Sequence, residues 1–496
     1  MSQVGIRESG HGLAVATLSQ SPLDLLIVGG GIVGSGIARD AALRGLRVGL
    51  VERRDFAWGT SSRSTRLLHG GIRYLAQAHL GLVRQASLEK AVVGRIAPHL
   101  AAPLPFLFPT YRGTAWPKWK LRVGVRLYDL LCNGRNFGAS SALSMAQLHE
   151  RVPGLRRDHG TGAVRYYDGA TDDARLVLDT LRSAARHGAT LCNYVSLDDA
   201  VRDGDCWRCR LTDHERQGQH EVAARCIVNA TGPWADRFTQ SRVRIRASKG
   251  IHLVLDGDRL PLEEALMMTE GRRVIVAVPW GERLYVGTTD TDYDGSLDDV
   301  QSDEQDVKYL LDLVNHYFPQ AAIGRSDVHC TWAGVRPLIA DGRGTPSDVS
   351  RNHEIIDGPD GWIDVAGGKL TTYRLIAQQS VDRVLRHLGT SARACRTAEE
   401  PLLDDSETQG VSGIVPPPVS ADVAHHACAN EWALHLDDVM VRRTRWHYYV
   451  KDRAAVARQV ASWMADRLGW DDARREQEIE RYDAQHRAGP CRPDSA

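Results

Sequence analysis

Three glycines followed by an acid are the feature of the sequence that most directly implies chemistry. Gly29, Gly31 and Gly34 have the G-x-G-x-x-G spacing, and Glu52 ends the next apolar run. The first glycine permits a tight turn, the second admits a pyrophosphate close to the backbone, and the third allows close helix–strand packing. The acid can accept both hydroxyls of an adenosine ribose. These residues predict a dinucleotide site, and a glycine turn without a ligand is the alternative.

A strand, a helix and a second strand are needed to hold these residues. Leu25 to Val28 are apolar enough for a buried parallel strand, and Arg47 to Val51 predict the next strand. A helix that begins at Ile32 and Val33 would turn its first backbone amides toward the phosphates.

The loop after Glu52 indicates which dinucleotide is bound. Residues 53–75 are rich in hydroxyls and glycines, whereas NAD enzymes usually continue directly into another strand–helix unit. Two later segments, 226–232 and 362–374, each predict a strand that ends in a turn of small residues. Three separate returns to one site favour FAD. The predicted FAD contacts in these segments are Thr60, Ser61, Ser62, Gly70, Gly71, Ala230, Gly232, Gly368, Lys369, Leu370 and Thr371.

Eight motifs occur in one order across about residues 22 to 380. They are GGGIVGSGIARDAALRG (29–45), GTSSRSTRLLHGGIRYL (59–75), DDARLVLD (172–179), VNATGPWAD (228–236), KGIHLV (249–254), GTTDTDY (287–293), AGVRPL (333–338) and GGKLTTYR (367–374). By these motifs the chain resembles the FAD-dependent glycerol-3-phosphate dehydrogenases of the quinone-linked, aerobic type. The first motif is common among flavoproteins, but the set is specific. VMVRRTRW (439–446) resembles a fragment of the family's C-terminal cap.

The resemblance implies oxidation of sn-glycerol 3-phosphate to dihydroxyacetone phosphate by hydride transfer to flavin, with electrons passed to a membrane quinone. A glycerol-3-phosphate oxidase that uses oxygen, or another FAD-dependent oxidoreductase of the same fold, is the alternative, because the motifs do not separate them. An NAD-dependent dehydrogenase and a non-catalytic flavin-binding adaptor are the alternatives from other classes.

Two residues at motif positions of the family are expected to be catalytic. The imidazole of His69, with an ordinary pKa of about 6.5, suits abstraction of the substrate's hydroxyl proton at neutral pH. A histidine that only organises the turn beside the cofactor is equally compatible with the sequence. Lys369 is the alternative, as a cation that stabilises charge on the reduced flavin.

Substrate recognition is expected from arginines, because a guanidinium matches the geometry of a phosphate. A surface salt bridge is the alternative for each arginine, and simple packing is the alternative for the tyrosine that accompanies them. The family's substrate positions correspond here to Arg73, Tyr74, Arg336 and Arg351.

The amino-acid composition argues against nucleic acid as a partner and against a disulfide framework. The 496 residues balance 62 basic against 62 acidic side chains, so the sequence has no basic footprint for nucleic acid. Nine cysteines in so long a chain do not indicate a disulfide framework, and the pair Cys206 and Cys209 lies in a strand-like run that separates the side chains. We expect FAD as the cofactor and no metal.

We expect a cytoplasmic protein that contacts the cytoplasmic membrane peripherally. The apolar patch in residues 1–21 is too short for a secretory signal. The apolar stretch Leu25 to Ala38 carries the cofactor glycines, so we do not expect it to span a membrane. Residues 116–128 combine aromatic rings with four cations and no acid, which predicts contact with anionic lipid; an ordinary amphipathic helix is the alternative. The sequence leaves open a homodimer.

The predicted fold class is α/β, with a Rossmann-like FAD-binding domain, an antiparallel-sheet substrate domain as in D-amino-acid oxidase, and a small helical C-terminal cap. The cofactor domain is discontinuous, and alternating runs at 272–278 and 283–289 predict antiparallel strands of the substrate domain. We assign residues 22–100, 172–235 and 330–385 to the FAD-binding domain, 101–171 and 236–329 to the substrate domain, and 395–496 to the cap.

Overall fold

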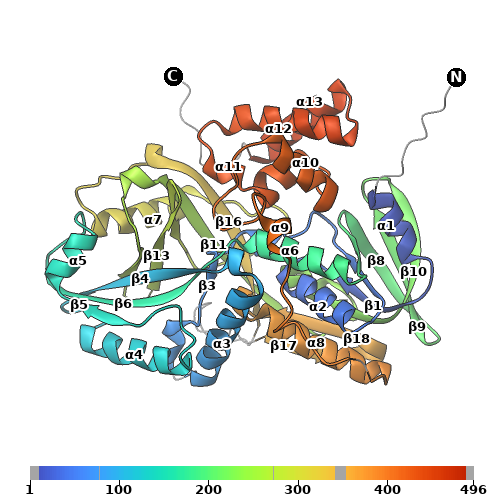
Figure 1. Ribbon diagram of the computed structural model, residues 1–496, viewed down its shortest axis with the longest axis horizontal. Helices are drawn as coiled ribbons and strands as arrows, with labels where there is room; N and C mark the ends of the chain where they lie inside the picture. The colour runs from blue at the N-terminus through green and yellow to red at the C-terminus, as the bar shows by residue number, and fades with distance from the viewer. Residues whose placement is uncertain (1–9, 78, 272, 341–352, 392, 487–496) are drawn as a thin grey trace.

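The computed structural model describes residues 10–77, 79–271, 273–340, 353–391 and 393–486 (Figure 1). Two sheets lie side by side, and the C-terminal helices lie above the junction between them. Helix α1 (Gly10–Leu18) packs near β7 of the first sheet.

The first sheet holds the predicted cofactor strand at its centre. Its order is β17-β18-β10-β1-β2-β7, and β1 pairs in parallel with β10 and with β2. Strand β9 pairs antiparallel with β10, and β8 with β9. The strands are β1 (Leu23–Val28), β2 (Val48–Val51), β7 (Thr190–Cys192), β8 (Val195–Asp203), β9 (Cys206–Asp213), β10 (Gly218–Asn229), β17 (His353–Asp357) and β18 (Trp362–Gly367).

Three helices pack together beside the parallel strands. Helix α2 (Ile32–Leu43) contacts both α6 (Asp173–Arg186) and α8 (Tyr373–Leu388). The Asp172 side chain caps α6 by accepting a hydrogen bond from the Arg175 amide, and α8 ends at Gly389 in the left-handed conformation that favours glycine. The predicted order of strand, glycine turn, helix and strand between residues 25 and 51 is confirmed.

The second sheet is mainly antiparallel. Its order is β15-β11-β14-β13-β12-β4-β6-β3, with β16 paired to β11 and β5 to β6. The predicted strands at 272–278 and 283–289 are β13 and β14, which pair antiparallel. The strands are β3 (Leu67–Leu68), β4 (Ala102–Tyr111), β5 (Ser141–Leu143), β6 (Gly160–Ala170), β11 (Ile245–Asp256), β12 (Ala265–Glu270), β13 (Arg273–Trp280), β14 (Arg283–Gly287), β15 (Thr291–Asp292) and β16 (Val328–Ile339).

Helices flank this second sheet. The helix α4 (Lys118–Leu131) contacts β6, and α7 (Glu304–Tyr317) contacts β11 and β12. The other helices of this part are α3 (Leu80–Ile96) and α5 (Met145–Arg151). Strand β16 pairs with β11 and so belongs to this sheet, although most of it falls in the segment 330–385 that we assign to the FAD-binding domain. The domain boundaries stay a prediction.

The C-terminal region is helical, as predicted. Its short π-helix η9 (Asp438–Arg443) contacts α6, which lies beside the first sheet. Its helix α11 (Trp446–Tyr449) contacts β16 of the second sheet. Its remaining helices are α9 (Asp405–Thr408), α10 (Ala421–Asn430), α12 (Arg453–Leu468) and α13 (Asp472–His486).

Candidate functional site

The glycine turn between β1 and α2 is built so that side chains cannot enter it. A Cβ atom on Gly34 would lie 1.9 Å from the carbonyl oxygen of Gly29, and Gly29 itself has φ +111°. A Cβ on Gly31 would lie 3.0 Å from Ser61 Oγ, in the space where a pyrophosphate would pass. The Ile32 amide donates to Ser61 Oγ at 3.0 Å, so the hydroxyl-rich loop is held against the helix start.

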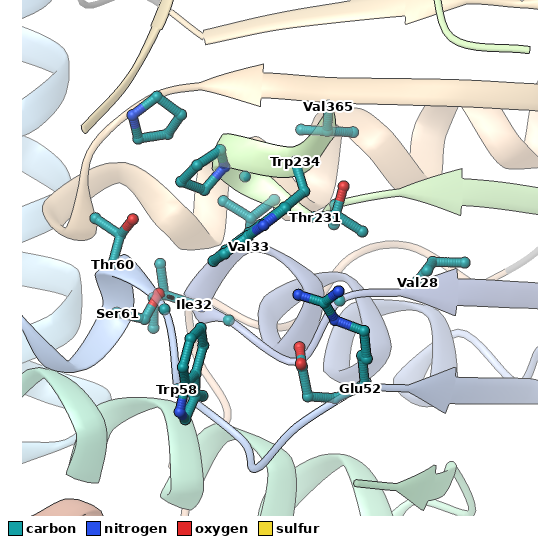
Figure 2. Close-up of a pocket in the computed structure, with 18 of the residues that line it drawn as sticks. Val28, Ile32, Val33, Glu52, Trp58, Thr60, Ser61, Thr231, Trp234 and Val365 are labelled. Atoms are coloured by element: carbon teal, nitrogen blue, oxygen red, sulfur yellow. Dashed lines mark hydrogen bonds between the residues drawn. The ribbon is translucent and has the colours of Figure 1, made fainter. Parts of the chain in front are cut away.

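Glu52 lies at the carboxyl end of β2 and points into the same space (Figure 2). Its carboxylate accepts hydrogen bonds from the amides of Gly30 at 2.8 Å and Arg54 at 2.9 Å. Burial raises the pKa of Glu52, and the two amide bonds oppose that shift. The position matches the predicted role of accepting ribose hydroxyls.

A first cavity of about 400 Å³ is lined by the glycine turn, the hydroxyl-rich loop and the two later returns. The hydroxyl-rich loop and the two later segments thus all return to the glycine turn, as the argument for FAD requires. Predicted cofactor residues that line this cavity are Gly29, Gly31, Ile32, Val33, Glu52, Thr60, Ser61, Ala230, Gly232, Gly368, Lys369 and Leu370.

Four further predicted cofactor residues pack on or bond to segments around this cavity: Gly34, Ser62, Gly70 and Thr371. Gly34 packs on Gly29, and the Ser62 carbonyl accepts a hydrogen bond from Arg445. The Gly70 amide donates to Tyr128 Oη at 2.9 Å, and the hydroxyl of Thr371 exchanges hydrogen bonds with the backbone of His69.

A second cavity of about 280 Å³ adjoins the first. The two share one segment above all, Gly367 to Leu370, which enters the wall of both. Of the predicted catalytic and substrate residues, His69, Tyr74, Arg336 and Lys369 line this second cavity, as does Gly71. Lys369 Nζ lies 3.9 Å from the centroid of the Tyr74 ring, a cation–π contact.

Arg336 extends from β16 into the second cavity. Its Nη1 donates to Asp290 Oδ1 at 3.1 Å, and its Nη2 donates to Thr288 Oγ1 at 3.0 Å. Both nitrogens also lie 3.2 Å from the Thr289 carbonyl oxygen. Gly250 faces this guanidinium, because a Cβ there would lie 2.5 Å from Arg336 Nη2.

Two predicted arginines cannot be placed in the site. Arg351 lies outside the described residues. The backbone of Arg73 belongs to the short helix η2 (Ile72–Gln77), but its side chain lies outside the described part of the structure.

His252 lines the second cavity although the sequence did not single it out as a site residue. Its Nε2 lies 3.0 Å from Thr65 Oγ1, and its ring stacks on Trp332 with centroids 4.8 Å apart. Burial, reinforced by the charges of Arg336 and Arg66, lowers the pKa of His252 well below its ordinary value. The imidazole is therefore neutral at physiological pH. Its place in KGIHLV on β11 was the available signal.

A buried network behind the Gly70 turn was also missed. Asp168, a residue of the second cavity's wall, accepts hydrogen bonds from Tyr128 Oη at 2.5 Å and from Lys90 Nζ at 3.0 Å. Tyr128 belongs to α4 and Lys90 to α3, so these helices hold the turn that carries His69. The three residues are far apart in sequence, which explains why no local motif revealed them.

The structure of helix α4 shows that two residues of the predicted lipid-contacting segment 116–128, Lys118 and Tyr128, face the protein instead. Lys118 Nζ donates to the Leu143 and Thr161 carbonyls at 2.6 and 3.3 Å, and Tyr128 is fully buried. Both were expected to face lipid, but both secure the helix to the protein. The outer face instead carries Trp119, Val123 and Leu130, which are 69%, 61% and 74% exposed. Three exposed cations accompany them: Lys120, Arg122 and Arg126.

The structure contains no helix, among the residues it describes, with the length and apolar character to cross a bilayer. In the same part of the chain, no cluster of three His, Cys, Asp or Glu residues is arranged as a metal site.

The residues present fit FAD. The turn at Gly29 to Gly34 excludes side chains where a pyrophosphate needs backbone amides, and Glu52 stands where the adenosine ribose would end. Gly367 to Leu370 line both this space and the second cavity.

The fold and the paired cavities define an FAD-dependent oxidoreductase. Residues 24–374 match the family described as FAD dependent oxidoreductase, and residues 355–475 match the C-terminal domain of alpha-glycerophosphate oxidase. The predicted fold class and the predicted FAD cofactor are thereby confirmed.

Individual relatives narrow this class. The aerobic glycerol-3-phosphate dehydrogenase of Staphylococcus haemolyticus is 36% identical over 401 residues, which cover 78% of this chain and 72% of the relative. Glycerol-3-phosphate dehydrogenase 2 of Mycobacterium bovis is 34% identical over 517 aligned positions, covering 94% and 88%. The X-ray structure of the Bacillus halodurans glycerol-3-phosphate dehydrogenase complexed with FAD matches with a TM-score of 0.78 at 27% identity and covers 98% of both chains. The chain belongs to the family of FAD-dependent glycerol-3-phosphate dehydrogenases.

Proposed function

We propose that the protein oxidises sn-glycerol 3-phosphate to dihydroxyacetone phosphate by hydride transfer to FAD. The observation that carries this proposal is the second cavity, which shares a wall with the proposed cofactor space and is lined by the Lys369 cation, the His69 imidazole and the Arg336 guanidinium. The names of the relatives support the choice of substrate.

The residues of the second cavity can divide the reaction between them. Bound FAD supplies the hydride acceptor. Arg336 binds the phosphate through charge-assisted hydrogen bonds, and His69 takes the proton from the substrate hydroxyl as the hydride leaves the same carbon. Lys369 provides positive charge beside the flavin. His69 as an organiser of the turn remains the competing assignment, because its backbone is bonded to Thr371.

Anaerobic bleaching of the flavin tests the substrate. Glycerol 3-phosphate should bleach the bound FAD, whereas glycerol, which lacks the phosphate, and 2-hydroxy acids should do so far more slowly. A faster reaction with a 2-hydroxy acid would contradict the proposal. Absence of bleaching by every substrate would favour a flavin-binding protein without this activity.

We propose a membrane quinone as the electron acceptor. The motifs resemble those of the quinone-linked dehydrogenases, and the relatives are named dehydrogenases; an oxidase that reduces oxygen is the alternative. Reoxidation of the reduced enzyme by a soluble quinone analogue should outpace reoxidation by air. Stoichiometric release of peroxide at a rate equal to turnover would instead identify an oxidase.

We propose that α4 contacts the cytoplasmic membrane. Its exposed apolar side chains and the cations Lys120, Arg122 and Arg126 suit the headgroup level of anionic lipid. Each cation near such a surface contributes about 1 kcal/mol, so three contribute about 3 kcal/mol.

Co-sedimentation with anionic liposomes at low salt tests this contact. The triple change of Lys120, Arg122 and Arg126 to Gln should release the enzyme while its activity with a dye acceptor stays. Changing the exposed Arg208, Arg210 and Arg458 to Gln removes equal charge elsewhere and should leave binding intact. Equal release of both variants would rule out α4. We also propose a homodimer, which sedimentation velocity of the holoenzyme tests.

A further inference from the structure

Three arginines of the C-terminal region contact the loop that forms one wall of the cofactor cavity. Arg442, Arg443 and Arg445 belong to the segment VMVRRTRW, and all three side chains are buried. The loop comprises residues 53–64 and is called here the cofactor loop; it lines the first cavity through Arg53, Arg54, Trp58, Gly59, Thr60, Ser61 and Ser64.

The first arginine contact fixes the beginning of the cofactor loop. Arg442 Nε and Arg443 Nη1 both donate to Asp55 Oδ2, and Arg443 Nη2 donates to Asp55 Oδ1 at 2.8 Å. Burial alone would raise the pKa of Asp55, but the charges of Arg443 and Arg442 hold it below its ordinary value. Two residues further on, the Ala57 amide donates to the Gly30 carbonyl at 3.0 Å, which connects this anchor to the glycine turn.

The second contact fixes the end of the cofactor loop. Arg445 Nη1 donates to the Ser62 carbonyl at 3.0 Å, and its Nη2 donates to Asp173 Oδ1. The other oxygen of Asp173 accepts from the Ser64 amide at 2.8 Å. Arg445 has φ +61°, a left-handed conformation that is unfavourable for residues other than glycine and is tolerated where the surroundings enforce it.

Between these anchors lie the side chains that face the cofactor. Ser61 Oγ accepts from the Ile32 amide at the start of α2, and Thr60 Oγ1 donates to the Val335 carbonyl at 2.6 Å. Movement of either end of the loop would displace both hydroxyls and Trp58. The described part of the C-terminal region therefore holds the ends of a loop that lines the first cavity, while none of its own described residues is among the lining residues of that cavity.

We propose that Arg442, Arg443 and Arg445 are positioning residues for FAD, so that tight cofactor binding requires the C-terminal region to be docked on the cofactor loop. Because linkage is reciprocal, FAD in turn stabilises the docked state of η9 and α11. This inference goes beyond the proposed reaction and does not depend on the identity of the substrate.

Titration of the full-length apoprotein with FAD, followed by flavin fluorescence, tests the proposal. Arg445→Gln removes a buried charge and the bond to Ser62, and Arg443→Lys keeps the charge but loses the paired bonds to Asp55. In both variants we expect the Kd for FAD to rise by about tenfold or more, because each change removes buried charge-assisted hydrogen bonds that hold one end of the cofactor loop. Arg458→Gln, an exposed change on α12, should leave the Kd unchanged. An unchanged Kd in folded variants of Arg443 and Arg445 would overturn the proposal.

Two readouts separate positioning from a general loss of structure. At saturating FAD, the Arg445→Gln enzyme should recover kcat close to that of the wild type, and a persistent loss would indicate collapse of the site and count against positioning. Hydrogen exchange in the wild type needs no variant: amides of residues 438–449 should exchange more slowly when FAD is added to the apoprotein. Equal exchange with and without FAD would overturn the proposal even if the variants do not fold.

Discussion

Replacing Arg336 by alanine should weaken substrate binding selectively for a phosphorylated substrate. The guanidinium enters the second cavity, and Asp290 already neutralises part of its charge through Nη1. Nη2 is bonded to two neutral partners, the Thr288 hydroxyl and the Thr289 carbonyl, which a phosphate can replace. We therefore count one charge-assisted bond to phosphate, from Nη2, and not two. Such a bond is worth about 1.5 to 3 kcal/mol, which corresponds to a rise of roughly 10 to 150 fold in the Kd for glycerol 3-phosphate.

Stopped-flow reduction of the flavin under anaerobic conditions measures this effect. The dependence of the rate on substrate concentration gives the Kd, and the plateau gives the rate of hydride transfer. The Kd should rise in Arg336→Ala while the rate with glycerol, which has no phosphate for Arg336 to bind, stays unchanged. Arg336→Lys keeps a point charge without the paired geometry and should lie between alanine and the wild type.

Asp290→Asn provides a matched control of opposite sign. It removes the carboxylate that competes with phosphate for Nη1, so glycerol 3-phosphate should bind more tightly than in the wild type. Equal loss of rate with glycerol and glycerol 3-phosphate in Arg336→Ala would refute the reasoning, because it would mean that the arginine supports the cavity without holding the phosphate.

Three further predictions concern the cofactor turn, the base and the response to pH. Gly34→Ala places a Cβ 1.9 Å from the Gly29 carbonyl oxygen and should give a colourless or unfolded protein, as should Gly31→Val. The control Gly81→Ala has open space around it and should keep normal flavin absorbance. A yellow, soluble Gly34→Ala protein would contradict the assignment of the turn. His69→Ala should slow flavin reduction by roughly 10² to 10⁴ fold with FAD still bound, and a near wild-type rate in single turnover would assign the proton to another group. Because the folded protein keeps the pKa of His252 well below its ordinary value, the unfolded chain gains a proton below about pH 6.5 that the folded protein does not, so stability falls as the pH drops from 7 to 5. This fall in stability should be smaller in His252→Gln but not absent, since burial also lowers the pKa of His329 to about 4. Denaturant unfolding at pH 7 and pH 5 measures the fall, and an equal fall in wild type and His252→Gln would exclude His252 as a source of it.

The cofactor site was predictable because its signals are local. The glycine spacing, the strand before it and the acid after it lie within residues 25–52, and steric exclusion at Gly34 follows from the turn itself. Arg336 and His69 were placed through motifs that resemble a known family. The structure brings both to the second cavity, but their roles in the reaction stay predictions.

The residues that were missed or misplaced depend on partners distant in sequence. His252 and Asp168 reach the second cavity only because separate strands of the second sheet converge on it. Lys118 was predicted to face lipid because the sequence shows its charge but not its hydrogen-bond acceptor. That acceptor is the carbonyl of Leu143, 25 residues further along the chain. Chemical type could be read locally, but the direction of a side chain could not.

The common wall at Gly367 to Leu370 has a consequence for how this protein can diverge. A substitution there changes the lining of both cavities together. Under the proposed reaction, selection for a new substrate at this segment would therefore act against retention of the flavin. Three other residues that line the second cavity avoid this conflict: Met267, Val274 and Val276. They come from β12 and β13, and of the two cavities described here they line only the second. Libraries for altered specificity should therefore randomise β12 and β13 and leave the segment after β18 unchanged.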